Sequence, residues 1–429
     1  MQQSSLRTPG FKRYWRWIEN LLFIFFFITI LYVTITSFFD GTWKSFFGMG
    51  FLHDLYDPIQ NKVYYKSVLA LLSVLTTFFL LLEMVRLFFQ MKPYLNFSNR
   101  YRTFLERLKN AAGSKKWAVF NDTLGNSSFL GEFLRRYKSN FLAKVFNEYI
   151  SKLFIIFVYI EMMPFFQKFA LFTIDNAWYS WLYAYLMWEL SYWIWHYAAH
   201  RIRLFWCLHS PHHAPAEMNL TVAWVHFFAE GYYTAAIQVP ILMIFGVRPE
   251  MVAIILVIDG TWGTFIHAGE DAFKNGRFGF LEKLLITPSH HRVHHARNPL
   301  YMDTNFCVLL PFWDWLFGTL QNEKKEVKIE YGISREMDVT NFIDFYFGEC
   351  ICLYNDFRKT KGFRNKFLLL FKPPGWTPES SEKTAIALRK EFLRGREELG
   401  RTSRDLLFNR IGVLEQRNNQ EVTQKNSAG

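Results

Sequence analysis

Apolar residues in this chain gather in long, uninterrupted runs, which is typical of membrane-spanning helices. Leu21–Phe39 is an uncharged run of 19 residues, and residues 67–85 form a second run, broken only by Glu83 near its end. Each run is long enough to cross a hydrocarbon core of roughly 30 Å as a helix. The pattern therefore predicts an N-terminal anchor region, residues 1–91, with two transmembrane helices.

Further apolar segments lie in the middle of the chain. Residues 153–174 and 178–195 are joined by a short polar turn, which predicts a tight hairpin. The run at 233–258 is interrupted by Gly-Val-Arg-Pro-Glu at 246–250, which favours two shorter helices. The aromatic segment 306–320 is too short between its breaks to span, and we expect it to lie against the membrane surface.

The apolar runs predict an all-α, polytopic membrane protein, and the distribution of positive charge predicts its orientation. Basic residues are dense after the second run and sparse in the loop before it, so the positive-inside rule places the N-terminus and the region after the second run in the cytoplasm. The expected regions are the anchor at 1–91, cytoplasmic connecting helices at 92–150, a membrane-embedded catalytic domain at 151–320, its aromatic and basic extension at 321–377, and a charged helical and disordered tail at 378–429.

Composition narrows the class of protein. Aromatic residues make up 19% of the chain and the net charge is +12, yet the basic residues flank apolar runs instead of lining a soluble face. That distribution argues against nucleic-acid binding and fits contact with anionic lipid headgroups. The four cysteines form no Cys-x-x-Cys pair, which is consistent with a catalytic side facing the reducing cytosol.

The candidate chemistry is a concentration of histidine. Eleven of the twelve histidines fall between His196 and His295, in the pattern His-x-x-x-His once and His-x-x-His-His twice. Residues three or four apart on a helix share a face, so each motif can aim its imidazoles at one point. A lone histidine is more often a hydrogen-bonded core residue, which is our interpretation of His53 and His226. The eight motif histidines are His196, His200, His209, His212, His213, His291, His294 and His295.

Neighbouring residues predict how the motifs are presented. Thr287 and Pro288 have the pattern of an N-cap and a first helical residue, so the third motif would occupy the first two turns of a helix. Pro211 is expected to start another helix, leaving His209 on the incoming loop. His267 lies in a still-apolar segment, where ionisable residues are usually functional, and is an additional candidate ligand.

Eight imidazoles are more than one tetrahedral zinc ion can use, so two metal ions are the simpler interpretation. Imidazole suits zinc, copper, iron and nickel alike. A lipid environment favours a redox metal able to attack an unactivated C–H bond, and zinc has no redox chemistry. The pattern therefore predicts two irons per chain on helix ends at the cytoplasmic face, with zinc as the rival.

In these motifs the sequence resembles the fatty acid hydroxylase and sterol desaturase superfamily of membrane di-iron enzymes. Residues 287–299, 313–319 and 362–376 look like the alkylglycerol monooxygenase branch of that superfamily, and the resemblance extends over roughly 64–376. Two positions depart from the branch. Arg201 stands where an acidic residue usually follows the first motif, and Trp224 stands where arginine is frequent. These departures affect the inferred substrate more than the metal site.

The resemblance implies that the motif histidines bind two irons and that a lipid is hydroxylated with dioxygen. Hydroxylation beside an ether oxygen would give a hemiacetal that releases an aldehyde. Glu189 matches an acidic family position, His290 is expected to support the third motif, and Asp314 is expected to hold a ligand histidine through its second ring nitrogen or to act as a local cap. No dinucleotide, haem or iron–sulfur motif is evident, so electrons must come from an external donor, for which the resemblance implies tetrahydrobiopterin.

Two alternatives share the histidine pattern. A fatty acyl or sterol hydroxylase or desaturase would keep every metal ligand and differ in its pocket. A histidine-rich metal transporter would distribute ionisable residues along full spans, whereas here they cluster mainly at span ends. Whether it is an ether-cleaving monooxygenase or another hydroxylase or desaturase, we expect a multi-pass protein of the endoplasmic reticulum or of a bacterial inner membrane.

Overall fold

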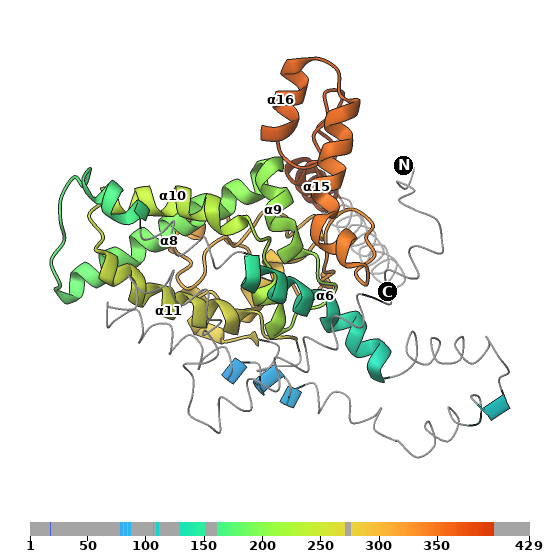
Figure 1. The fold of residues 1–429 in the computed structure, drawn as a ribbon, viewed down its shortest axis with the longest axis horizontal. Coiled ribbons are helices and arrows are strands. Elements are labelled where there is room, and N and C mark those ends of the chain that lie inside the picture. Colours follow the sequence, from blue (N-terminus) through green and yellow to red (C-terminus); the bar gives the residue numbers. More distant parts are fainter. Residues whose placement is uncertain are drawn as a thin grey trace, which may run out of the picture.

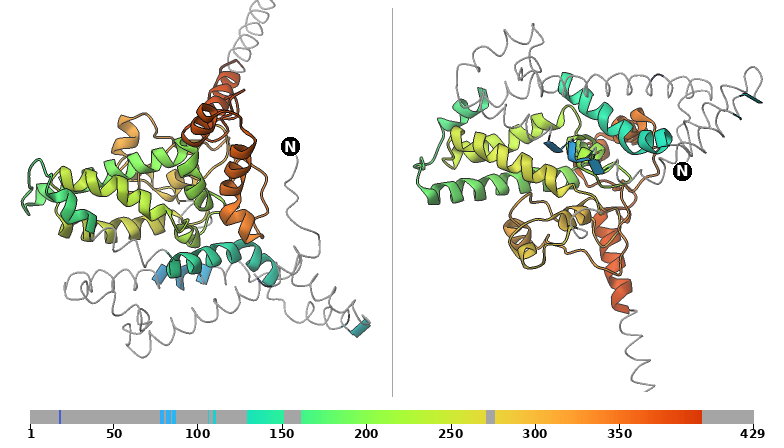
Figure 2. Two further views of the ribbon diagram at one scale, coloured as in Figure 1. Left: turned by 45° about the horizontal axis from the view of Figure 1, so that its top comes forward. Right: turned by 90° about the horizontal axis from the view of Figure 1, so that it is seen from below.

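Three apolar helices form the body of the protein in the computed structural model, which describes residues 129–150, 161–270 and 276–398 and a few positions between 18 and 110. Helices α8 (Trp178–Arg201), α10 (Glu230–Ile244) and α11 (Pro249–Ile266) lie side by side, α8 packing against both of the others (Figures 1 and 2). Their shared core includes Trp188 and Leu242, which are fully buried. The predicted span at 21–39 and most of the one at 67–85 lie outside the described residues.

The outer faces of these helices are apolar. Leu182, Ile254 and Ile258 are each between 44% and 53% exposed, which is unusual for large apolar side chains in a soluble protein and typical of a lipid-facing surface. In the described part of the chain, α11 is the one helix that is both long and apolar enough to cross a membrane.

A sharp turn separates α10 from α11, as the predicted break at 246–250 requires. Gly246 adopts φ of 75°, a conformation in which side chains are strained. A Cβ atom there would lie 2.5 Å from the carbonyl oxygen of Phe172. The amide of Val247 donates to the carbonyl of Leu242 and that of Gly246 to Met243, closing the end of α10. The turn therefore needs glycine for its conformation and for the space beside it.

Helix α9 (Arg203–His213) corrects one prediction from the sequence. Pro211 lies inside this helix and does not start it, so His209 is helical and not on a loop. Proline removes the hydrogen bond that the carbonyl of Cys207 would accept four residues earlier. That carbonyl instead accepts from the Ser210 hydroxyl at 3.5 Å and from the Cys350 thiol at 3.6 Å. Local side-chain partners thus compensate for the proline.

The remaining elements surround α9 and the ends of the apolar helices. The described residues form no strand and have one isolated bridge, between Ala296 and Tyr331. Helix α15 packs against α9 and α6, and α16 packs against α9 (Figure 1). These elements are α6 (Phe129–Ile150), helical residues 161–167, η2 (Leu220–Trp224), η3 (Gly279–Lys283), α13 (Pro288–His294), α14 (Phe312–Leu316), α15 (Phe342–Lys359), α16 (Phe363–Phe371) and a helix at 385–398. The apolar segment predicted at 153–174 is thus helical only to residue 167 in its described part.

Candidate metal centre

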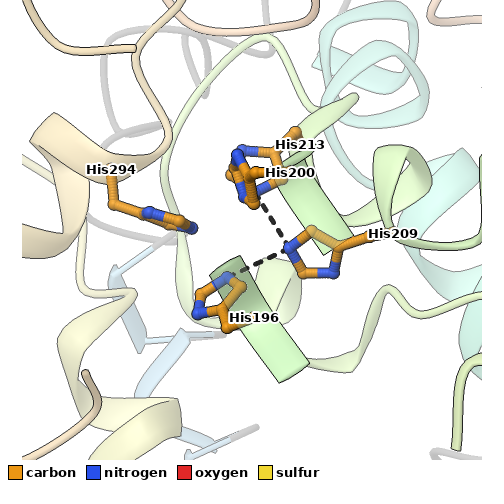
Figure 3. A group of neighbouring side chains, drawn as sticks. All are labelled: His196, His200, His209, His213 and His294. Carbon is orange, nitrogen blue, oxygen red and sulfur yellow. Dashed lines mark hydrogen bonds between the residues drawn. The ribbon is translucent and has the colours of Figure 1, made fainter. Parts of the chain in front are cut away.

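Nine buried histidines meet where α8, α9, α11 and α13 converge. They are the eight motif histidines and His267, and they form two groups, within each of which one nitrogen per residue lies within 4.8 Å of the others. Figure 3 shows the imidazoles of the first group facing a common point. The five-histidine cluster contains His196, His200, His209, His213 and His294, and the four-histidine cluster contains His212, His267, His291 and His295.

Each helix contributes to the clusters through its periodicity. The last turns of α8 carry His196 and His200 four residues apart on one face. Helix α13 begins as predicted, with Thr287 as N-cap and Pro288 as its first residue, and its final turn presents the third motif. His267 is the C-cap of α11. The second and third motifs each contribute histidines to both clusters, so the two clusters share the same two helices.

The outer ring nitrogens bind acceptors, and this fixes the tautomers. In the five-histidine cluster, Nδ1 of His196 lies 2.8 Å from the carbonyl of Phe306, and Nδ1 of His294 lies 2.8 Å from the carbonyl of Thr304. Nδ1 of His209 lies 2.7 Å from a carboxylate oxygen of Glu230. A carbonyl or carboxylate oxygen can only accept, so each Nδ1 carries the hydrogen and each Nε2 presents a lone pair inward.

These inward nitrogens face one another without a proton between them. Nε2 of His209 lies 3.1 Å from Nε2 of His196 and 3.1 Å from Nε2 of His213, the two contacts dashed in Figure 3. His196 and His209 both donate through Nδ1, so neither can donate to the other. In the described part of the protein, the buried Nε2 atoms of His200 and His294 have no hydrogen-bond partner. Facing lone pairs repel unless a cation lies between them, so the arrangement fits a metal ion.

The four-histidine cluster repeats this geometry. Nδ1 of His212 lies 3.1 Å from the carbonyl of Val225, and Nδ1 of His267 lies 2.5 Å from the carbonyl of Gly263. Their Nε2 atoms are 3.3 Å apart, and Nε2 of His291 is 2.9 Å from that of His267. The donor set therefore fits a second ion. Burial lowers the pKa of all four histidines, which keeps them neutral as ligation requires. Burial also lowers the pKa of His294 in the first cluster to about 3.

Two acidic residues at the clusters are absent from the sequence prediction. Glu230, 3% exposed at the start of α10, accepts from Nδ1 of His209 and, at 3.0 Å, from Nδ1 of His226. Asp303 adopts φ of 56° and places a carboxylate oxygen 3.4 Å from Nδ1 of His200. Neither belongs to a histidine motif, and the one available signal for Glu230 is its charge at the edge of an apolar run. His226 itself stacks on His212 at 4.7 Å and is hydrogen-bonded to Glu230 as expected, but its side chain is 42% exposed, so it is not a core residue.

Glu189, His290 and Asp314 are predicted from the sequence to support the metal ligands. The first two bind residues outside the histidine clusters. Glu189 is fully buried and accepts from the backbone amides of Val308, Leu309 and Leu310. His290 binds Asn322 through Nε2 at 2.8 Å and closes the capping box with Thr287.

Asp314 holds no ligand histidine directly, which corrects that version of its expected role. Its carboxylate accepts from the amides of Phe306 and Cys307, each at 2.8 Å, because it sits inside the loop and not beside an imidazole. The same Phe306 offers its carbonyl to His196. Asp314 therefore fixes the backbone that orients His196, one step away from the cluster.

The chain is similar in sequence to proteins of known families. Residues 181–319 match the fatty acid hydroxylase family. The chain is 34% identical to alkylglycerol monooxygenase of Xenopus tropicalis over 48% of this chain and 44% of that one, and 33% identical to that of Homo sapiens over 49% and 46%. A very-long-chain aldehyde decarbonylase of Oryza sativa is 28% identical over 31% of this chain and 22% of its own. The matches span about half the length of the alkylglycerol monooxygenases, and no solved structure matches.

Proposed function

We propose that this chain, whose residues 181–319 match the fatty acid hydroxylase family, is an iron-dependent monooxygenase that hydroxylates a membrane lipid with dioxygen. The observation that carries the proposal is the set of neutral imidazoles whose inward nitrogens face one another at 2.9 to 3.3 Å in two adjacent clusters. Among the metals that imidazole binds, zinc lacks redox chemistry and could not activate dioxygen. Iron fits both this donor set and a hydrocarbon substrate, and it is the metal that the resemblance to the di-iron hydroxylases implies.

We assign one iron to each cluster, giving two per chain. The nine clustered histidines act as ligands, and Glu230 and Asp303 hold His209 and His200 from the side away from the metals. When bound, the irons supply the activation of dioxygen that organic side chains cannot provide.

The protein surroundings orient these ligands and exclude water. Phe306 lies against three histidines of the first cluster, with ring centroids 5.2 to 5.8 Å from those of His196, His200 and His294. Trp195 stacks on His196 at 5.2 Å on another side. A dry site of this kind strengthens electrostatic interactions and limits side reactions.

We propose an ether lipid as substrate because two alkylglycerol monooxygenases are 34% and 33% identical to this chain. Insertion of one oxygen atom into the C–H bond beside the ether oxygen gives a hemiacetal. Its hydroxyl proton passes to the ether oxygen as the carbon–oxygen bond breaks, leaving an aldehyde and a free glycerol hydroxyl. The second oxygen atom leaves as water and consumes two electrons from an external donor, for which we propose tetrahydrobiopterin.

We further propose the topology predicted from the sequence. The chain is a multi-pass protein of the endoplasmic reticulum or of a bacterial inner membrane, with the clusters on the cytoplasmic side. The exposed apolar side chains of α8 and α11 support membrane embedding. The regional division at 91, 150, 320 and 377 remains part of this proposal.

Product analysis with labelled dioxygen tests the function. The purified protein would receive an alkylglycerol, a fatty acyl lipid or a sterol, each with ¹⁸O₂ and reduced pterin. The proposal predicts a labelled aldehyde from the alkylglycerol. A labelled hydroxyl or a new double bond in the acyl or sterol substrate, with the ether lipid untouched, would instead establish the alternative hydroxylase or desaturase.

A further inference from the structure

A cavity of about 840 Å³ opens beside the five-histidine cluster and has no role in the proposed metal chemistry. It lies between the end of α8, the loop at 302–304, the residues after α14 and the helix at 385–398. Asp303 and Thr304 line it and also contact His200 and His294. The aromatic ring of Phe306 contacts both Tyr197, which lines the cavity, and His200, with ring centroids 5.4 Å and 5.2 Å apart.

Basic side chains outnumber acidic ones in the cavity lining, which contains Arg201, Arg389, Lys390 and Arg394 against Asp303 and Glu397. Arg201 lies 3.3 Å from Asp303, but its Nε is buried without a hydrogen-bond partner among the described residues. Arg389 donates to two neutral oxygens, the carbonyl of Met302 at 3.4 Å and the amide oxygen of Gln321 at 3.1 Å. No carboxylate in the described part of the chain forms an ion pair with Arg389. Burial lowers the pKa of Arg389, and the charge of Arg201 adds to this effect while Asp303 opposes it.

Apolar side chains also line the cavity, and several of them are exposed. Phe317 packs on Trp193 with ring centroids 4.4 Å apart and is 48% exposed. Ile386 and Leu393, which also line the cavity, are 52% and 40% exposed. Phe317 follows α14, whose Trp315 is 68% exposed. The apolar part of the lining therefore continues into the aromatic surface that we expect to contact the membrane.

We propose that this cavity binds an amphiphile through an anionic head, a phosphate or a carboxylate, placed between Arg201 and Arg389. Guanidinium groups bind such anions in a planar, two-pronged geometry, and an anion here would offset the repulsion between the two arginines. The hydrocarbon chain would lie along Trp193 and Phe317 toward the membrane. A cation-lined head site with an apolar wall excludes a purely polar anion and a neutral lipid alike as the preferred ligand.

Calorimetric titration of the metal-depleted full chain in neutral detergent tests this site independently of the proposed function. The probes are dodecyl phosphate, dodecanoate, dodecanol and inorganic phosphate. We expect dodecyl phosphate or dodecanoate to bind at least ten times more tightly than dodecanol, and Arg389→Gln and Arg201→Gln each to weaken that binding about ten-fold. Arg396→Gln is the matched control, because Arg396 lies on the same helix, pairs with Glu326 at 3.2 Å and does not line the cavity.

Several results would overturn the proposal. Equal affinity for dodecanol and the charged amphiphiles would remove the anionic head site. An equal loss in Arg396→Gln would reduce the effect to general surface charge. Binding of inorganic phosphate as tight as that of dodecyl phosphate would make the site one for a free anion and not for a lipid.

Two controls accompany these measurements. Unchanged melting temperatures would show that the variants fold. Arg389→Lys keeps the positive charge and should retain part of the affinity for the charged amphiphiles.

Discussion

Replacing Glu230 by glutamine should loosen metal binding without removing any ligand. Glu230 accepts from Nδ1 of His209 at 2.7 Å and from Nδ1 of His226 at 3.0 Å while buried. His209 is the central imidazole of its cluster, because its Nε2 faces those of both His196 and His213 at 3.1 Å. Glutamine keeps the size of the side chain but removes the charge that anchors this ring.

The expected magnitude follows from that geometry. Loss of a carboxylate partner behind a metal-bound histidine typically weakens metal affinity by about 10- to 100-fold, or roughly 1.4 to 2.7 kcal/mol. Chelator competition on the iron-loaded protein measures the affinity, and elemental analysis counts the remaining metal. We expect loss of one iron at a chelator concentration that leaves the native protein loaded.

A control separates this effect from a general change of charge. Glu250 is half exposed and pairs with Arg248 at 2.9 Å, so Glu250→Gln should leave iron binding unchanged. If Glu230→Gln held both irons as tightly as the native protein, Glu230 would not anchor a ligand and the assignment of His209 would have to be withdrawn.

Other substitutions test the scaffold and its link to the clusters. Gly246→Ala should destabilise the protein by about 1 to 3 kcal/mol in thermal or denaturant unfolding, because its Cβ would lie 2.5 Å from the carbonyl of Phe172. Gly279→Ala, at φ of 59° with nothing within 4 Å, should cost less, and equal losses would contradict the steric argument. Asp314→Asn should cost about 1 to 3 kcal/mol by leaving a buried amide of Phe306 or Cys307 poorly paired. It should also lower iron content, and unchanged stability and iron would show that the loop does not depend on this carboxylate.

Local features were predictable from the sequence because short-range chemistry determines them. The capped start of α13 follows from Thr287 and Pro288, and the break before α11 follows from glycine and proline at 246–250. The spacing of the histidine motifs likewise predicted which imidazoles share a face. Pro211 misled the prediction because Ser210 and Cys350 satisfy the carbonyl that it frees, and Cys350 is remote in sequence.

Features that depend on tertiary packing were not predictable. The division of the histidines into clusters of five and four separates His212 from His213, neighbours in sequence that point to different centres. Glu230 and Asp303 reach the histidines only after α10 and the 302–304 loop fold against α8 and α9. The helical segment at 385–398 lines the cavity beside the five-histidine cluster, a position that its charged sequence did not indicate.

Metal analysis of the purified protein tests most directly whether two irons bind between the clustered histidines. His294 belongs to the five-histidine cluster and His291 to the four-histidine cluster, so the double variant His291→Ala, His294→Ala weakens both. We expect about two irons per native chain and their loss from the variant. Stoichiometric zinc without iron after iron-replete expression, or iron retained by the variant, would contradict this expectation.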